Sequence, residues 1–120
     1  MTVKEIAGIL NAEILCCEDA ASDVQIHSAC GSDMMSDVLA YVKDQGMLLT
    51  GLVNPQVVRT AEMMDMCCVA FVRGKRPDES IIELARGKNI ILLATQERMY
   101  QACGKLYKAG HQVPAFAMLQ

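Results

Sequence analysis

From residue 47 onward, short apolar runs alternate with segments whose apolar residues recur at helical spacing, and this alternation constrains the fold most. The run at 66–72 is almost continuously apolar, which is typical of a strand covered on both faces of a parallel sheet. Strands and helices that alternate through short connections favour right-handed βαβ crossovers. We therefore predict an α/β fold of three layers, with a mostly parallel sheet, helices on both faces and a βαβαβα order in the C-terminal two thirds.

The clearest joint between a predicted strand and a predicted helix lies at residues 47–55. Three apolar residues at 47–49 indicate a short buried strand, and Thr50 and Gly51 end it. Asn54 and Pro55 then favour a helix start, because Asn caps a free backbone N–H and Pro fits the first helical position. Such joints gather at the carboxyl ends of parallel strands, where ligands usually bind.

The first third of the chain predicts two helices and two strands. Thr2 and Glu5 have the spacing of a capping box at the start of a helix. We expect strands at 12–17 and 24–30, and a second helix that follows Ser32 as its N-cap. After the strands at 66–72 and 89–94, we expect helices that begin at Asp78 and Thr95.

The composition indicates one cytoplasmic domain that pairs with a second copy. Of the 120 residues, 52% are apolar, which suggests surface buried against another subunit. A net charge of −3 argues against nucleic-acid binding, and no apolar run approaches the ~20 residues of a membrane span. The N-terminal residues do not resemble a signal peptide. We expect one domain over residues 1–110 and a partly apolar tail at 111–120.

The six cysteines do not form a recognisable metal-binding pattern. They include two adjacent pairs, at 16–17 and 67–68, with no Cys-x-x-Cys and no histidine at zinc-site spacing. Because adjacent strand residues point to opposite faces, we expect each pair to divide between two environments. We predict buried, reduced thiols and no metal or other cofactor; a metal or iron–sulfur site is the alternative.

No catalytic motif is evident, so we expect that the protein is not an enzyme. The sequence contains neither a P-loop, nor Gly-x-Gly-x-x-Gly, nor a nucleophile elbow. His27 and His111 have no evident Ser or Cys partner. We predict no catalytic residue.

Candidate ligand-binding residues follow the predicted strands. Helix N-termini present free N–H groups that suit phosphate, and the basic residues at 73–76 add positive charge. Each candidate could instead have a structural role, because Asn54 and Thr95 could cap helices, the glycines could permit turns, and Lys75 and Arg76 could be exposed to solvent. The candidates are Ser32, Thr50, Gly51, Asn54, Arg73, Gly74, Lys75, Arg76 and Thr95.

Four segments together resemble the DRTGG domain family. They are ACGSDMMSDVL at 29–39, LTGL at 49–52, NPQV at 54–57 and FVRGKRP at 71–77. Thr50 and Gly51 match the Thr-Gly of the name motif, and Leu52 stands where that motif has its second glycine. The chain contains no contiguous Asp-Arg-Thr-Gly-Gly run.

The resemblance implies a three-layer α/β domain that commonly dimerises. The family occurs as a regulatory module in phosphotransacetylases and in inorganic pyrophosphatases that carry CBS domains, where it helps bind adenine-nucleotide effectors at a symmetric interface. It is similar to the amino-terminal domain of HPr kinase/phosphorylase, whose phosphate-binding loop lies in a second domain. The resemblance therefore implies regulation and not kinase activity.

Three functions are compatible with these observations. The leading hypothesis is a non-catalytic regulatory domain that binds an adenine nucleotide or another phosphorylated small molecule at a homodimer interface, and that acts on a partner protein. The alternative is a structural or assembly subunit without a small-molecule ligand. A third hypothesis is a small phosphate-handling enzyme that uses Arg73, Lys75 and Arg76, although no general base is evident.

Overall fold

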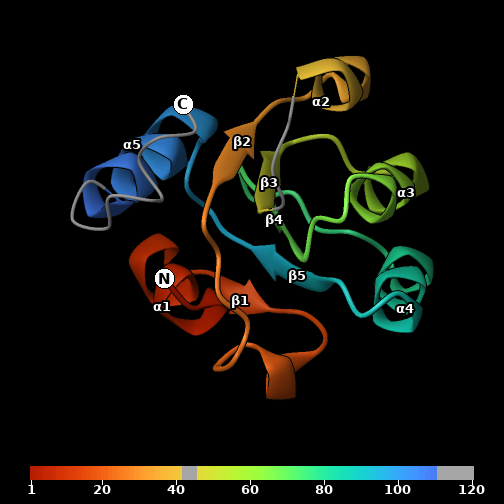
Figure 1. The fold of residues 1–120 in the computed structure, drawn as a ribbon, viewed down its shortest axis with the longest axis horizontal. Coiled ribbons are helices and arrows are strands. Elements are labelled where there is room, and N and C mark those ends of the chain that lie inside the picture. Colours follow the sequence, from red (N-terminus) through yellow and green to blue (C-terminus); the bar gives the residue numbers. More distant parts are fainter. Residues whose placement is uncertain (42–45, 111–120) are drawn as a thin grey trace.

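A five-stranded sheet forms the middle layer of the computed structural model, which describes residues 1–41 and 46–110 (Figure 1). The strands are β1 (Glu13–Ile14), β2 (Ala29–Gly31), β3 (Met47–Thr50), β4 (Cys68–Phe71) and β5 (Ile91–Ala94). Their order in the sheet is β1-β5-β4-β3-β2. Strands β2 to β5 are parallel, and only β1 runs antiparallel, at the edge beside β5. The predicted mostly parallel sheet is confirmed.

Five α-helices lie on the two faces of this sheet (Figure 1). They are α1 (Val3–Leu10), α2 (Met35–Tyr41), α3 (Pro55–Met63), α4 (Glu79–Gly87) and α5 (Met99–Gly110). Helices α1 and α5 pack on one face, and α2, α3 and α4 pack on the other. The three-layer arrangement and the βαβαβα order after residue 47 are therefore confirmed.

Local sequence explains where three of the helices begin. Thr2 and Glu5 form the predicted capping box of α1. The Asn54 side chain accepts the Val57 N–H at 3.2 Å at the start of α3, and Asp78 accepts the Ile81 N–H at 3.1 Å at the start of α4. Each cap satisfies a backbone donor that lacks a partner within its helix.

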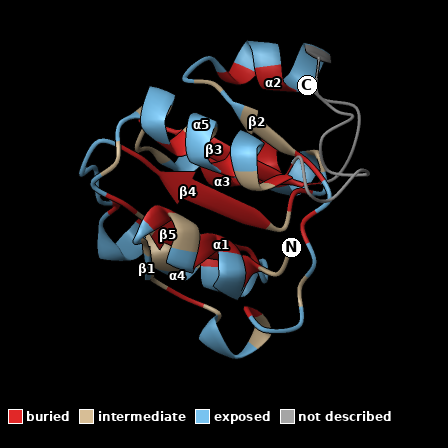
Figure 2. Cartoon of the chain, turned by 90° about the vertical axis from the view of Figure 1, so that its left-hand side faces the viewer, coloured by how far each residue is buried: buried red, intermediate tan, exposed pale blue. Residues whose placement is uncertain are grey.

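The core divides into two apolar clusters because successive strand residues face opposite layers. Along β4, Cys68 and Ala70 join the cluster under α1 and α5, whereas Val69 and Phe71 join the cluster under α3 and α4. All four residues of β4 are buried, and Figure 2 shows this strand in red between the layers. The interpretation of residues 66–72 as a strand covered on both faces is correct.

The N-terminal strands are shorter than predicted. The predicted strand at 12–17 is reduced to β1, because Cys17 adopts a left-handed conformation (φ 58°) that bends the chain into a short 3₁₀ turn, Glu18–Ala20. The predicted strand at 24–30 is reduced to β2, and Gln25 forms an isolated bridge with Thr2 instead. In both places, contacts with neighbouring segments replace regular pairing.

The Cys16–Cys17 pair divides only in part between two environments: Cys16 belongs to the cluster under α2, α3 and α4, whereas Cys17 packs against both clusters. Both thiols donate to the same acceptor, the Ile90 carbonyl, at 3.3 Å from Cys16 and 3.7 Å from Cys17. Because the backbone at Cys17 is left-handed, the strict alternation of an extended strand does not apply to this pair.

The predicted tail at 111–120 lies outside the described residues. In the part of the chain that the structure describes, no helix is long and apolar enough to cross a bilayer.

Candidate functional site

The carboxyl ends of β2, β3 and β4 bring together four residues that we call the strand-end site: Asp33, Thr50, Gly51 and Arg73. Asp33 follows β2, Thr50 ends β3, and Arg73 follows β4. Because the three strands are neighbours and parallel, their last residues meet at one edge of the sheet. The edge predicted to bind a ligand is thus the edge where these polar groups converge.

The Asp33 carboxylate accepts hydrogen bonds from two other residues of the strand-end site. Its Oδ1 accepts the Gly51 N–H at 2.7 Å and the Thr50 hydroxyl at 3.1 Å. The same hydroxyl oxygen accepts the Leu52 N–H at 3.1 Å. These bonds hold the turn after β3 against the end of β2.

Arg73 places a guanidinium group over this turn. Its backbone is left-handed (φ 62°), and its N–H donates to the Glu97 carbonyl at 2.7 Å. A Cβ at Gly51 would collide with the guanidinium, so any other residue there would force the flexible Arg73 side chain to move. Arg73 Nη2 lies 3.8 Å from Asp33 Oδ2, and both side chains are about half exposed.

A hollow of about 170 Å³, which we call the loop hollow, is lined mainly by the loops that follow β4 and β5. Its lining includes four of the predicted residues, Gly74, Lys75, Arg76 and Thr95. Gly74 is left-handed (φ 71°), as Arg73 is, and its N–H donates to the Thr95 carbonyl at 3.0 Å. The loop after β4 is thereby fixed to the loop after β5.

Only part of the positive charge in this loop is open to a ligand. Arg76 forms two hydrogen bonds of 2.9 Å with the Glu13 carboxylate. The guanidinium lowers the pKa of Glu13, and the carboxylate raises the pKa of Arg76. Lys75 is exposed and forms no ion pair with any described residue.

Three predicted residues have roles within the chain. The Asn54 side chain caps α3. Ser32 Oγ accepts the Met34 N–H at 3.0 Å and forms a turn before α2, which begins at Met35. Thr95 does not begin a helix as predicted: its buried hydroxyl donates to the Leu10 carbonyl at 2.6 Å, and α5 begins only at Met99. The Thr95 hydroxyl thus joins β5 to α1.

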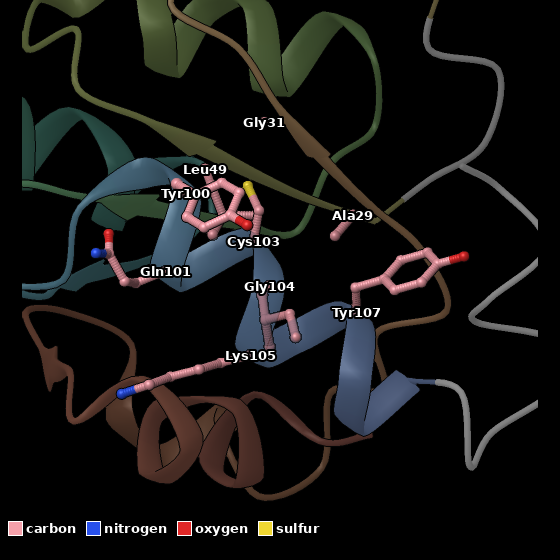
Figure 3. A pocket seen from close by; sticks show the side chains of 10 residues that line it. Ala29, Gly31, Leu49, Tyr100, Gln101, Cys103, Gly104, Lys105 and Tyr107 are labelled. Atoms are coloured by element: carbon pink, nitrogen blue, oxygen red, sulfur yellow. The ribbon is translucent and has the colours of Figure 1, made fainter.

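A larger apolar groove of about 540 Å³, which we call the α5–β2 groove, lies on the face that carries α1 and α5. Figure 3 shows that α5 supplies most of its lining side chains, including Tyr100, Cys103 and Tyr107, while Gly31 and Leu49 belong to the sheet. Tyr100 is 86% exposed, so its ring adds apolar surface beside the groove. Among the described residues, no group of three or more His, Cys, Asp or Glu side chains is placed to hold a metal ion.

Asp33 and the α5–β2 groove were not predicted from the sequence. Asp33 had a usable signal, because it lies in the joint Gly31-Ser32-Asp33 that follows the predicted strand at 24–30. The groove had none, because it depends on how far α5 extends across the sheet toward β2.

Comparison with known proteins gives a family and a fold. The sequence model of the DRTGG domain matches residues 5–109. A similar solved structure is the crystal structure of the CBS and DRTGG domains of the regulatory region of Clostridium perfringens pyrophosphatase, complexed with the activator diadenosine tetraphosphate. The TM-score is 0.65 at 18% identity, over 88% of this chain and 45% of that one. This chain therefore spans less than half of that structure. No curated protein matches the chain.

Proposed function

The chain belongs to the DRTGG domain family, and we propose that it is a non-catalytic regulatory domain that senses a phosphorylated small molecule, such as an adenine nucleotide. The similar structure is a regulatory region bound to a dinucleotide activator, which supports this class of ligand. The whole of that protein is longer than this chain, so the proposal concerns the domain alone.

The observation that carries the proposal is the strand-end site. A backbone N–H, a threonine hydroxyl and a guanidinium group converge at the carboxyl edge of a parallel sheet. Such donors bind phosphate oxygens strongly, and arginine adds a planar pair of donors. Lys75, in the loop hollow, offers a further positive charge for a second phosphate group.

The chemistry of the site supports binding without catalysis. Among the described residues, Asp33 is the carboxylate that accepts the Thr50 hydroxyl, and the same oxygen, Oδ1, also accepts the Gly51 N–H. These two hydrogen bonds occupy the lone pairs with which that oxygen would accept the proton of a nucleophile. The site is therefore better suited to hold an anion than to activate a nucleophile.

Calorimetric titration with AMP, ADP, ATP and diadenosine tetraphosphate tests this proposal. We expect at least one of them to bind the wild-type protein and to bind Arg73→Ala at least tenfold more weakly. Arg86→Ala is the matched control, because Arg86 lies in the last turn of α4, away from the strand-end site. Absence of binding across the panel, or equal losses in both variants, would refute the proposal.

One observation favours the alternative function, an assembly subunit without a small-molecule ligand. The α5–β2 groove is largely apolar, and Tyr100 and Tyr107 stand exposed beside it. We propose that a second copy of the chain covers this face and forms a homodimer. If the protein dimerises and none of the four nucleotides binds, the assembly function replaces the regulatory one.

A further inference from the structure

We propose that the Asp33 carboxylate is the resident occupant of an oxyanion site, and that a ligand's phosphate group binds there by displacing it. This inference rests on the proposed function and adds a way in which ligand binding at the same site is regulated. In the absence of ligand, Asp33 keeps the site closed. In its presence, Asp33 and the segment that carries it are released.

The geometry around Asp33 is that of a bound anion. One carboxylate oxygen accepts the Gly51 N–H at 2.7 Å and the Thr50 hydroxyl at 3.1 Å. The other lies 3.8 Å from the guanidinium of Arg73. A carboxylate and a phosphate share this preference for charge-assisted donors, so the donors that hold Asp33 also suit a phosphate group.

The two anions cannot occupy the site together. A phosphate oxygen that accepted the Gly51 N–H would lie where Asp33 Oδ1 lies now. Two negative charges a few ångströms apart repel each other, and this repulsion weakens phosphate binding while Asp33 remains. Because Asp33 and Arg73 are each about half exposed, a ligand can reach the site without opening the core.

Displacement of Asp33 would lower the local stability of α2. Asp33 lies in the short link between β2 and α2, and its two hydrogen bonds tie that link to the end of β3. Among the residues of α2 whose side chains are described, only Met35 and Val38 are buried. Few buried contacts mean a low local stability, so loss of the Asp33 bonds frees a weakly held helix.

The test is a titration with inorganic phosphate at constant ionic strength, followed through the amide resonance of Gly51. We compare the wild type with Asp33→Asn, which removes the charge and keeps an acceptor oxygen, and with Asp33→Ala. Asp37→Asn is the matched control, because it makes the same charge change in the first turn of α2. Thermal unfolding of each variant verifies that it is folded, and Asp33→Asn alone suffices if Asp33→Ala does not fold.

We expect Asp33→Asn to bind phosphate at least about fivefold more tightly than the wild type, from the removal of one charge at roughly 4 Å in a solvent-exposed setting. Asp37→Asn should change the affinity less than twofold. Phosphate binding to the wild type should also speed hydrogen exchange in α2. If phosphate binds the wild type and the Asp33→Asn variant binds it equally or more weakly, this inference is wrong and the proposed function still stands. If phosphate perturbs Gly51 in none of the variants and no nucleotide binds the wild type, the proposed function fails as well.

Discussion

Arg76 and Glu13 form a bidentate ion pair, with both N–O distances at 2.9 Å, and this pair ties the loop after β4 to the edge strand β1. The carboxylate neutralises one of the basic residues of the loop. Arg73 and Lys75 are therefore the basic residues of this loop that remain for an anionic ligand. The pair also joins the parallel part of the sheet to its one antiparallel strand.

This ion pair gives a pH dependence that can be measured at a single residue. Arg76 lowers the pKa of Glu13 in the folded protein, so the pair contributes stability above the ordinary value of 4.5 and loses it as the pH falls through the lowered pKa. We expect Arg76→Gln to return the carbon-13 NMR titration midpoint of the Glu13 carboxyl to near its ordinary value. The midpoint of Glu5, which the cap of α1 lowers, should stay unchanged. An unaltered Glu13 midpoint would show that the pair does not form in solution.

Asn54 should stabilise α3 through its cap. Its side chain accepts the Val57 N–H at 3.2 Å, and removal of such a cap typically costs roughly 1 kcal/mol. We expect Asn54→Ala to lower the free energy of unfolding by about this amount in urea titrations. Asn54→Asp, which keeps a capping oxygen, should lose much less. Equal stability of the alanine variant and the wild type would contradict the cap. If Asn54 also contacts ligand, Asn54→Ala should lower affinity more than it lowers stability.

The left-handed backbone at Arg73 should make glycine the more stable residue at this position, whereas the guanidinium group of Arg73 should serve ligand binding. A residue other than glycine in the left-handed region costs roughly 1–2 kcal/mol. With φ at 62°, Arg73→Gly should therefore be more stable than Arg73→Ala, although both lose the guanidinium. Paired urea titrations measure the difference, and nucleotide binding should be weakened equally in the two variants. A glycine variant less stable than the alanine variant would show that the loop does not adopt this conformation.

The sequence predicted the elements whose signals are local and complete. The cap at Asn54, the capping box of Thr2 and the apolar run of β4 each depend on a few adjacent residues. The N-terminal strands depend on partners far along the chain, so their length could not be read locally. Thr95 shows the same limit, because its hydroxyl bonds the carbonyl of Leu10 at the far end of the sequence.

The sequence predicted which edge of the sheet carries the candidate site, but not how the residues of the site are arranged there. Thr50, Gly51 and Arg73 could be proposed because each follows a strand, and the structure brings them together around Asp33. Their relative positions depend on the order of β2, β3 and β4 in the sheet, which residue patterns alone do not give. For the same reason the sequence could not separate the strand-end site from the loop hollow.

The cysteines should differ in reactivity according to burial. Burial raises the pKa of Cys16 to about 11 and raises the pKa of Cys68 well above its ordinary value, so both stay protonated near neutral pH. Because the thiolate is the nucleophile, we expect iodoacetamide at pH 8 to spare these two in the folded protein and to modify all six in urea. Mass spectrometry of peptides locates the modified residues. Rapid modification of Cys16 or Cys68 in the folded protein would contradict the structure.

The thiols are also expected to be reduced and free of metal in the purified protein. The structure records all six as free cysteines. Elemental analysis should find no stoichiometric zinc or iron. One metal ion per chain would overturn the interpretation of the cysteines as packing residues.

The last prediction concerns assembly. Light scattering at micromolar concentration should give about twice the chain mass of 13.1 kDa, because the apolar face beside α5 needs a cover and two-fold pairing is the commonest way to supply one. The interface should exceed the ~1,000 Å² of a convincing biological contact.

We expect Tyr100→Glu, in the α5–β2 groove, to give a monomer. Met63→Glu is the matched control, since Met63 is also exposed but lies on α3, on the opposite face of the sheet. A wild-type monomer would refute the dimer, and a dimer that only Met63→Glu dissolves would move its interface to the other face.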